Sequence, residues 1–152
     1  MDLINSNKRI VPVGRLDMYT SGALILSNDG DLIYKITHPK HEITKTYEAI
    51  VDGKVDDYMI KKLREGIEID NYITKPAKAE ILSYDANKDV TKIKIIIHEG
   101  KNRQVRKMLA AVGKQTIELE RTKIGDISTQ GLKYGQWRLL KKEEVDKLIK
   151  KW

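Results

Sequence analysis

Apolar positions along the chain predict short strands interleaved with short helices. Tyr47, Ala49 and Val51 fall on one face of the segment 46–51, which is typical of a half-buried strand. Further strands are expected over 23–26, 77–83, 91–98 and 116–121. Since hairpin-linked strands and helices alternate without a regular strand–helix–strand rhythm, the pattern favours the α+β class, with a mixed, largely antiparallel sheet flanked by helices.

Caps and apolar stripes predict four helices. Asn28-Asp29-Gly30 is a turn that leads into the first, and Asp56-Asp57 caps the second, which ends at Gly66. Gly113 closes the third, and the fourth lies at the C-terminus. The expected spans are 31–36, 58–65, 102–112 and 142–151.

The third predicted helix combines an apolar stripe with a basic face. The stripe that should face the core consists of Val105, Met108, Leu109 and Val112. Arg103 and Lys107 lie nearly opposite it, in solvent, while Arg106 falls on its flank, where the guanidinium can reach a cleft. Lys101 and Arg103 are expected in the first turn, an arrangement that suits a bound phosphate. An ordinary solvated basic face is the alternative.

Two opposite charges lie between apolar segments near the start of the chain. Arg15 and Asp17, within Gly14-Arg15-Leu16-Asp17, follow the apolar run 10–13 and precede the apolar run 23–26. Burial of both side chains would be unfavourable unless each were paired and hydrogen-bonded. This position favours a functional use of the two residues, against the alternative of a surface turn with an incidental ion pair.

Composition narrows the class of protein. The 152 residues suffice for one domain, assigned to 1–152, and the net charge of +7 favours a polyanionic partner. The absence of cysteine excludes a disulfide framework, a thiolate metal site and a cysteine nucleophile. No apolar run approaches the ~20 residues of a membrane span, and the first residues lack the features of a signal peptide, so a cytoplasmic location is expected.

Some suggestive residues are better explained structurally. Asp29-Gly30-Asp31 is interpreted as a turn and helix cap rather than an acidic metal site. His38 and His41 lack a third ligand for zinc. Trp137 is expected to anchor the last strand against the C-terminal helix rather than to stack on RNA.

Three motifs, in order along the chain, resemble those of the Rsu/RluB-type ribosomal RNA pseudouridine synthases. They are Gly14-Arg15-Leu16-Asp17, Lys45-Thr46-Tyr47, and the run from Glu99 to Arg106, which is followed by Leu119-Glu120-Arg121 and Ile124-Gly125. The resemblance extends over about 10–140. It implies a pseudouridine synthase-like catalytic domain with an active-site cleft, and the isomerisation of one uridine in ribosomal RNA, with the large subunit favoured.

The resemblance also implies roles for individual residues. Asp17 is the expected nucleophile or electrostatic partner of the ribose, Arg106 the guanidinium that keeps it ionised, and Tyr47 the tyrosine that packs on the base. Tyr47 could alternatively be a core residue, and Arg15 could brace the loop instead of binding phosphate. Candidate RNA-binding cations are Arg15, Lys45, Lys101, Arg103, Lys107 and Arg121. No metal or cofactor is implied, and the expected partner is structured RNA with its target uridine in a loop or unpaired region, not a membrane.

Two features typical of the family are missing from this sequence. Family members usually carry an N-terminal S4-type RNA-binding domain and then a strand with a Lys-Pro-x-Gly motif, so this chain is interpreted as N-terminally truncated relative to them. Two alternatives therefore stay open. One is a catalytically impaired RNA-binding or ribosome-assembly module of the same fold, and the other is an unrelated basic structural protein.

Overall fold

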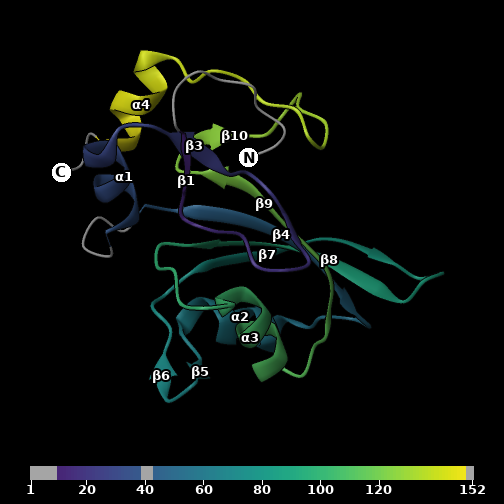
Figure 1. Ribbon diagram of the computed structural model, residues 1–152. Helices are drawn as coiled ribbons and strands as arrows, with labels where there is room; N and C mark the ends of the chain where they lie inside the picture. Colours follow the sequence, from purple (N-terminus) through teal and green to yellow (C-terminus); the bar gives the residue numbers. More distant parts are fainter. Residues whose placement is uncertain (1–9, 39–42, 150–152) are drawn as a thin grey trace.

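A six-stranded sheet crosses the middle of the computed structural model, which describes residues 10–38 and 43–149 (Figure 1). Its strands are β2 (Thr20–Gly22), β4 (Lys45–Asp52), β7 (Lys78–Asp85), β8 (Val90–Ile97), β9 (Thr116–Ile124) and β10 (Ile127–Ser128). The remaining elements are β1 (Val11–Val13), β3 (Ile25–Ser27), β5 (Glu68–Ile69), β6 (Tyr72–Ile73), α1 (Gly30–Thr37), α2 (Asp57–Glu65), α3 (Gln104–Ala111) and α4 (Lys142–Ile149).

β4 is central to the sheet because it pairs along its whole length with neighbours on both sides. The order is β10-β9-β4-β8-β7, with antiparallel pairing throughout, and β2 joins β9 in parallel. β1 pairs with β3, and β5 with β6, in two separate hairpin-like ribbons. The predicted α+β class with a largely antiparallel sheet is confirmed.

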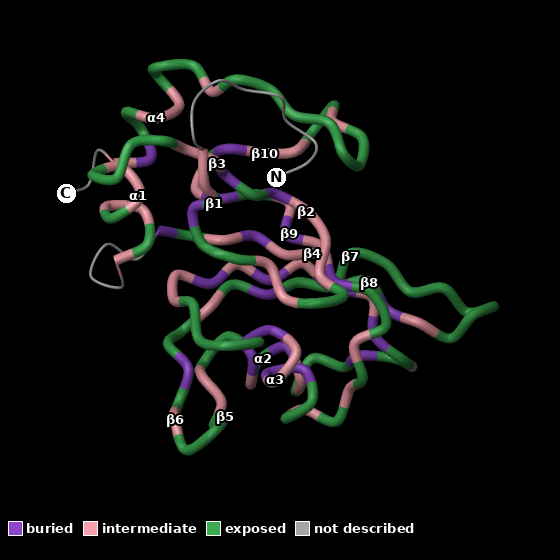
Figure 2. The backbone as a smooth tube through the Cα atoms, in the orientation of Figure 1, coloured by how far each residue is buried: buried purple, intermediate pink, exposed green. Residues whose placement is uncertain are grey.

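Two groups of buried residues hold the fold together (Figure 2). The first, here the large core, lies where α2 and α3 pack on the sheet and includes Leu63, Ile93, Met108 and Leu109. The second, here the small core, gathers β1, β3, β10 and α4 around Val13, Ile25, Ile127 and Leu148. β9 runs from one core to the other, since Leu119 lies in the large core and Ile124 in the small core, so this strand fixes the two relative to each other.

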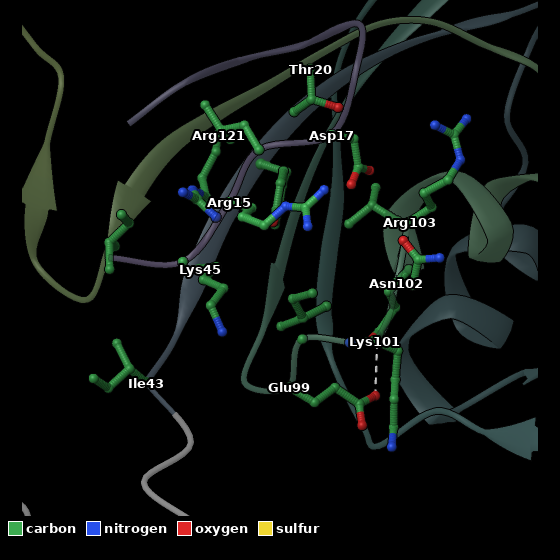
Figure 3. A pocket seen from close by; sticks show the side chains of 18 of the residues that line it. Arg15, Asp17, Thr20, Ile43, Lys45, Glu99, Lys101, Asn102, Arg103 and Arg121 are labelled. Atoms are coloured by element: carbon green, nitrogen blue, oxygen red, sulfur yellow. Dashed lines mark hydrogen bonds between the residues drawn. The ribbon is translucent and has the colours of Figure 1, made fainter. Parts of the chain in front are cut away.

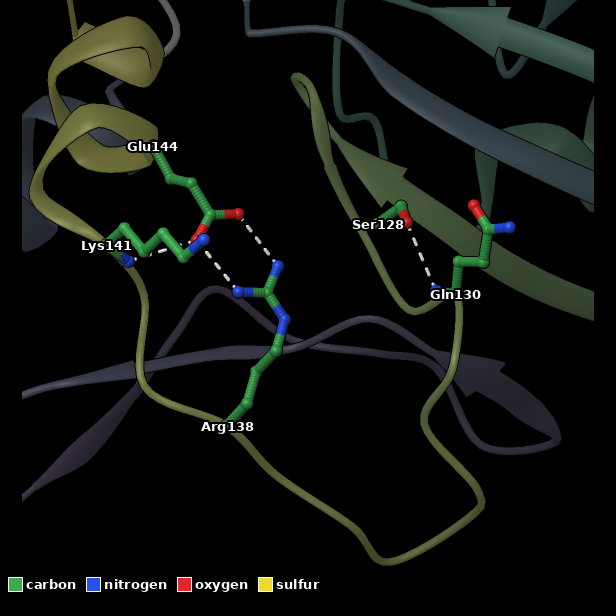
Figure 4. Close-up of polar contacts among 5 residues, drawn as sticks. All are labelled: Ser128, Gln130, Arg138, Lys141 and Glu144. Atoms are coloured by element: carbon green, nitrogen blue, oxygen red, sulfur yellow. Dashed lines mark hydrogen bonds and ion pairs between the residues drawn. The ribbon is translucent and has the colours of Figure 1, made fainter.

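The segment before α4 is held against that helix by polar contacts (Figure 4). Both terminal nitrogens of Arg138 donate to the carboxylate of Glu144, each at 2.8 Å, and the Lys141 N–H donates to the same carboxylate at 3.0 Å. The hydrogen bonds with Arg138 hold the pKa of Glu144 at about 2. Trp137, beside this cluster, is 53 % exposed and lies outside any strand, so the prediction that it anchors the last strand is wrong.

Most predicted elements are confirmed, and the differences have local causes. The first turn of the predicted 102–112 helix is not helical, because the left-handed backbone of Arg103 (φ 52°) delays the start of α3 until Gln104. The strand expected over 23–26 begins instead at Ile25, since Ala23 is bonded to Arg121 at the end of β2. α4 ends at Ile149 within the described range, and the rest of that predicted helix lies outside it.

A candidate active-site cleft

A cleft of about 910 Å³ lies between the two cores (Figure 3). Its walls come from the loop after β1, the end of α1, the start of β4, the hairpin β5–β6, the segment after β8, and β9. Arg15 and Asp17 face Asn102 and Arg103 across it. Segments that are far apart in the sequence thus converge on one cavity, as expected for a binding site.

Asp17 lies half-buried in the loop that connects β1 to β2. Its carbonyl accepts a hydrogen bond from the N–H of Thr20 at 3.0 Å, and Tyr19 within this turn has a left-handed backbone (φ 68°). Because β2 starts at Thr20 and pairs with β9, the turn is fixed to the sheet immediately after the carboxylate. Arg15, on the same loop, is exposed and also lines the cleft.

Arg106 connects α3 to the loop that carries Asp17. One terminal nitrogen donates to the carbonyl of Tyr19 at 2.7 Å and to the hydroxyl of Thr20 at 3.2 Å, while its buried Nε has no acceptor. Burial and the charge of Arg103 lower the pKa of Arg106, and the charge of Asp17 raises it. The flank position predicted for Arg106 therefore brings it near Asp17, with its hydrogen bonds made to the two residues that follow the turn.

Lys45 and Tyr47 lie on one face of β4 and both line the cleft. Burial, and secondarily the charge of Arg121, lower the pKa of Lys45. Tyr47 is half-buried and also packs against the large core. The two interpretations of Tyr47, as a core residue and as a cleft residue, are thus compatible.

Arg121, predicted as an RNA-binding cation, is a buried residue at the wall of the cleft. It is only 5 % exposed, and its Nε and one terminal nitrogen donate to the carbonyl of Ala23 at 2.9 and 2.7 Å. A buried guanidinium needs such partners, and here they fasten β2 to β9. Arg121 thus has a structural role, and its contact with RNA phosphate stays a prediction.

Three consecutive exposed residues, Lys101, Asn102 and Arg103, form what is here termed the basic turn. All three line the cleft, and the turn ends where the Gln104 N–H donates to the Lys101 carbonyl at 3.1 Å. Lys107, predicted as a further RNA contact, does not line the cleft, and its ammonium pairs with Asp70. Lys101 and Arg103 thus line the cleft, whereas Lys107 of α3 forms an ion pair outside it.

One polar network at the cleft was missed by the sequence analysis. The carboxylate of Glu99 accepts hydrogen bonds from the Tyr72 hydroxyl, from the Lys75 N–H at 2.9 Å and from Gln104 Nε2 at 2.7 Å. Tyr72 lies on β6, and the polar turn Asp70-Asn71, which separates Ile69 from the pair Tyr72-Ile73, was a signal for that hairpin.

The acidic residues near α1 form a helix cap, as predicted. The Asp29 carboxylate accepts from the N–H groups of Asp31 and Leu32, at 3.0 and 3.2 Å. Within residues 10–38 and 43–149, no three His, Asp or Glu side chains are grouped as a metal site would require. His41 lies outside the described residues. No helix in the same two ranges is long and apolar enough to cross a membrane.

The fold has known counterparts among solved structures. A pseudouridylate synthase crystal structure superposes with a TM-score of 0.83 over 91 % of this chain and 59 % of that chain, at 37 % sequence identity. The archaeal box H/ACA sRNP Nop10–Cbf5 complex is similar in fold alone, with a TM-score of 0.58 at 20 % identity over 80 % of this chain and 40 % of that one. The fold is thus that of a pseudouridine synthase.

Sequence comparison gives the family. The sequence model of the RNA pseudouridylate synthases matches residues 2–111. Ribosomal large subunit pseudouridine synthase B of Bacillus subtilis is 45 % identical, over 95 % of this chain and 59 % of its own. Ribosomal small subunit pseudouridine synthase A of Vibrio vulnificus is 36 % identical, over 90 % of this chain and 58 % of its own. The chain belongs to the RNA pseudouridylate synthase family, as its motifs predict, and spans less than two thirds of each of these relatives.

Proposed function

We propose that this chain is the catalytic domain of an enzyme that converts one uridine of ribosomal RNA to pseudouridine. The observation that carries the proposal is the position of Asp17, half-buried at a large cleft whose opposite rim is cationic. Large-subunit RNA is the favoured substrate, since the large-subunit relative from B. subtilis is 45 % identical and the small-subunit relative from V. vulnificus 36 %. Such a role also favours a cytoplasmic location.

The reaction breaks the N1–C1′ bond of uridine, turns the uracil and joins its C5 to C1′; the proton on C5 leaves to solvent, and N1 takes up a proton. No electrons are gained or lost overall. A carboxylate assists by attacking C1′ or by stabilising positive charge that develops on the ribose, and Asp17 supplies that group in either case.

Arg106 holds the turn that carries this carboxylate. Its guanidinium donates to the Tyr19 carbonyl and to the Thr20 hydroxyl, the residues that follow Asp17 in the turn, and its positive charge lies near the carboxylate. Its Nε is a buried donor with no acceptor among the described residues.

Tyr47 and the surrounding cations bind the RNA. A uracil turned out of an unpaired region needs a stacking partner, and the half-buried ring of Tyr47 at the cleft provides one. Arg15, Lys45 and the basic turn are positioned to neutralise backbone phosphates. Lys107, paired with Asp70, contributes less than these groups.

Tritium release from ribosomal RNA transcripts labelled at C5 of uridine tests the proposal. The chain should release tritium, Asp17→Asn should lower the rate by about a thousandfold or more, and both proteins should bind RNA equally. Asp146→Asn, which alters an exposed carboxylate on α4 outside the cleft, is the matched control and should match the wild type.

Other results would reject the proposal in distinguishable ways. RNA binding without tritium release would show an RNA-binding module that lacks catalysis as it stands. Equal release by the wild type and Asp17→Asn would remove Asp17 from the chemistry. Binding that does not distinguish ribosomal RNA from any polyanion at raised salt would favour a basic structural protein.

A further inference from the structure

Glu99 lies beside the basic turn (Figure 3), and Gln104 follows that turn in the chain. Gln104 is only 3 % exposed; its Nε2 donates to Glu99 at 2.7 Å, and its Oε1 accepts from the Lys101 N–H at 3.2 Å. The side chain of Gln104, which follows the turn, is thus bonded to Glu99 and to Lys101, the first residue of the turn. Such local side-chain bonds can fix a turn that belongs to neither a helix nor a strand.

The hairpin β5–β6 holds the same turn from outside. The Tyr72 hydroxyl and the Lys75 N–H both donate to Glu99, and the Lys101 ammonium lies 4.5 Å from the centre of the Tyr72 ring. At the hairpin tip, Asp70 pairs with Lys107 of α3. These contacts join the hairpin to the turn and to α3, so the hairpin and the turn should move as one unit.

The basic turn needs this support because of its backbone. Arg103 has a left-handed conformation (φ 52°), which residues other than glycine rarely adopt, and no side chain caps the helix that follows. A conformation of this kind persists only when its surroundings impose it, and it is concentrated at functional sites. Here the surroundings are the network of Glu99.

We propose that Glu99, together with Tyr72, is a positioning residue that holds Lys101, Asn102 and Arg103 in the geometry that binds the RNA backbone. This inference rests on the proposed function, because it assumes RNA in the cleft. Glu99 does not act on the substrate itself, since Oε1 accepts from Lys75 and Gln104 and Oε2 accepts from Tyr72. A loss of this support should weaken RNA binding and leave the chemical step intact.

The ionisation of Glu99 agrees with that role. Burial acts to raise its pKa, but the hydrogen bonds from Tyr72, Lys75 and Gln104, with the charge of Lys75, hold the pKa below its ordinary value. The carboxylate therefore stays charged at neutral pH. A group that holds its proton so weakly is a poor general base, which favours positioning over proton transfer.

The proposal is tested by measuring RNA affinity and the single-turnover rate of three variants, Glu99→Ala, Glu99→Gln and Tyr72→Phe. The control is Glu118→Gln, which alters an exposed carboxylate on β9. The probe is a labelled ribosomal RNA hairpin fragment. Glu99→Ala should raise Kd about tenfold, with a saturating rate close to wild type. Glu99→Gln should largely restore Kd, since its amide can accept from Gln104 and donate to the tyrosine oxygen. The Glu99→Ala/Tyr72→Phe double variant should be no worse than Glu99→Ala.

Amide hydrogen exchange provides a second readout that does not depend on RNA or activity. Exchange at Lys75, Lys101 and Gln104 should be faster in Glu99→Ala than in the wild type, at unchanged melting temperature. If Kd and exchange both stay at wild-type values, the inference is overturned. If the wild type neither binds nor modifies RNA while exchange responds as expected, the proposed function fails and the role of the network in holding the turn survives.

Discussion

The large and small cores differ in how they are built, and the cleft uses both. Among the described residues, fourteen buried side chains form the large core and seven form the small core. The strands that cover the large core, such as β4 and β8, have eight residues each, whereas β1 and β3 have three. The basic turn adjoins the large core and Asp17 adjoins the small one. The carboxylate thus lies in the less heavily packed region.

This difference indicates how the site keeps its geometry. Small packed regions open locally at lower free energy than large ones, and functional loops are often drawn from them. Two arginines compensate, because Arg106 reaches from α3 to the turn after Asp17, and buried Arg121 fastens Ala23 to β9. The position of Asp17 therefore depends on long-range hydrogen bonds more than on local packing.

Gly22→Ala should have the largest effect on stability, because it disrupts the contact between β2 and β9. Gly22 has a φ of +119°, and an added Cβ would lie 2.0 Å from the Arg121 carbonyl oxygen. We expect a loss of about 3 kcal/mol or more in stability, with fast hydrogen exchange in β1 to β3 while β4 and β8 stay protected. Gly135→Ala, at φ +81° with open space around it, should lose only about 1 kcal/mol. Equal destabilisation by both variants, measured by urea unfolding, would contradict the account.

Lys45→Met should change stability and RNA affinity in opposite directions. Burial and Arg121 lower the pKa of Lys45, so the folded protein is penalised while this lysine is protonated. We expect a higher melting temperature at neutral pH and a weaker RNA affinity, with the slope of log Kd against log salt reduced by about one. Lys88→Met, in the exposed β7–β8 turn, should change neither.

The sign of the pH dependence follows from the same shift. Since the pKa of Lys45 is lower in the folded state than the ordinary 10.5, the penalty is present at neutral pH and disappears as pH rises through the lowered value toward 10.5. The stability advantage of Lys45→Met over wild type should shrink over that range. An advantage that is constant with pH would show that packing, rather than charge, is responsible.

Glu144→Gln should have the smallest effect, confined to the small core. The pKa of Glu144 is lowered from 4.5 to about 2, so its contribution is present above pH 4.5 and is lost as pH falls from 4.5 toward 2. The wild type and Glu144→Gln should thus melt at slightly different temperatures at pH 7 and at converging temperatures near pH 2. Because the pair lies at the surface and is partly exposed, a large difference at pH 7 would contradict the account.

The sequence predicts the large-core region better than the small-core region. Caps such as Asp56 and the alternation of β4 are local signals, and the observed elements follow them closely. β1 and β2 have three residues each and carry no periodic signal, and β2 pairs with β9 about a hundred residues away. Such pairing depends on tertiary contacts that no short window of sequence contains.

In the candidate site too, some residues are predicted from the sequence and others are not. Motifs locate Asp17, Tyr47 and the basic turn in the sequence, and the fold brings them to one cleft. The buried state of Arg121 and the network of Glu99 were not predicted, since a residue type does not reveal burial and Tyr72 reaches Glu99 from 27 residues away. The left-handed backbone of Arg103 was likewise not predicted, because helix propensity gives no signal for it.

Single-turnover pseudouridine formation by Asp17→Asn and Arg103→Ala, with RNA affinity measured in parallel, tests the central claim most directly. The account predicts that Asp17→Asn loses the saturating rate by about a thousandfold or more and keeps its Kd. Arg103→Ala should raise Kd severalfold and keep the saturating rate, because the role proposed for Arg103 is to hold phosphate. Substantial turnover by Asp17→Asn, or a lost saturating rate in Arg103→Ala at unchanged Kd, would contradict the division between chemistry on one side of the cleft and RNA binding on the other.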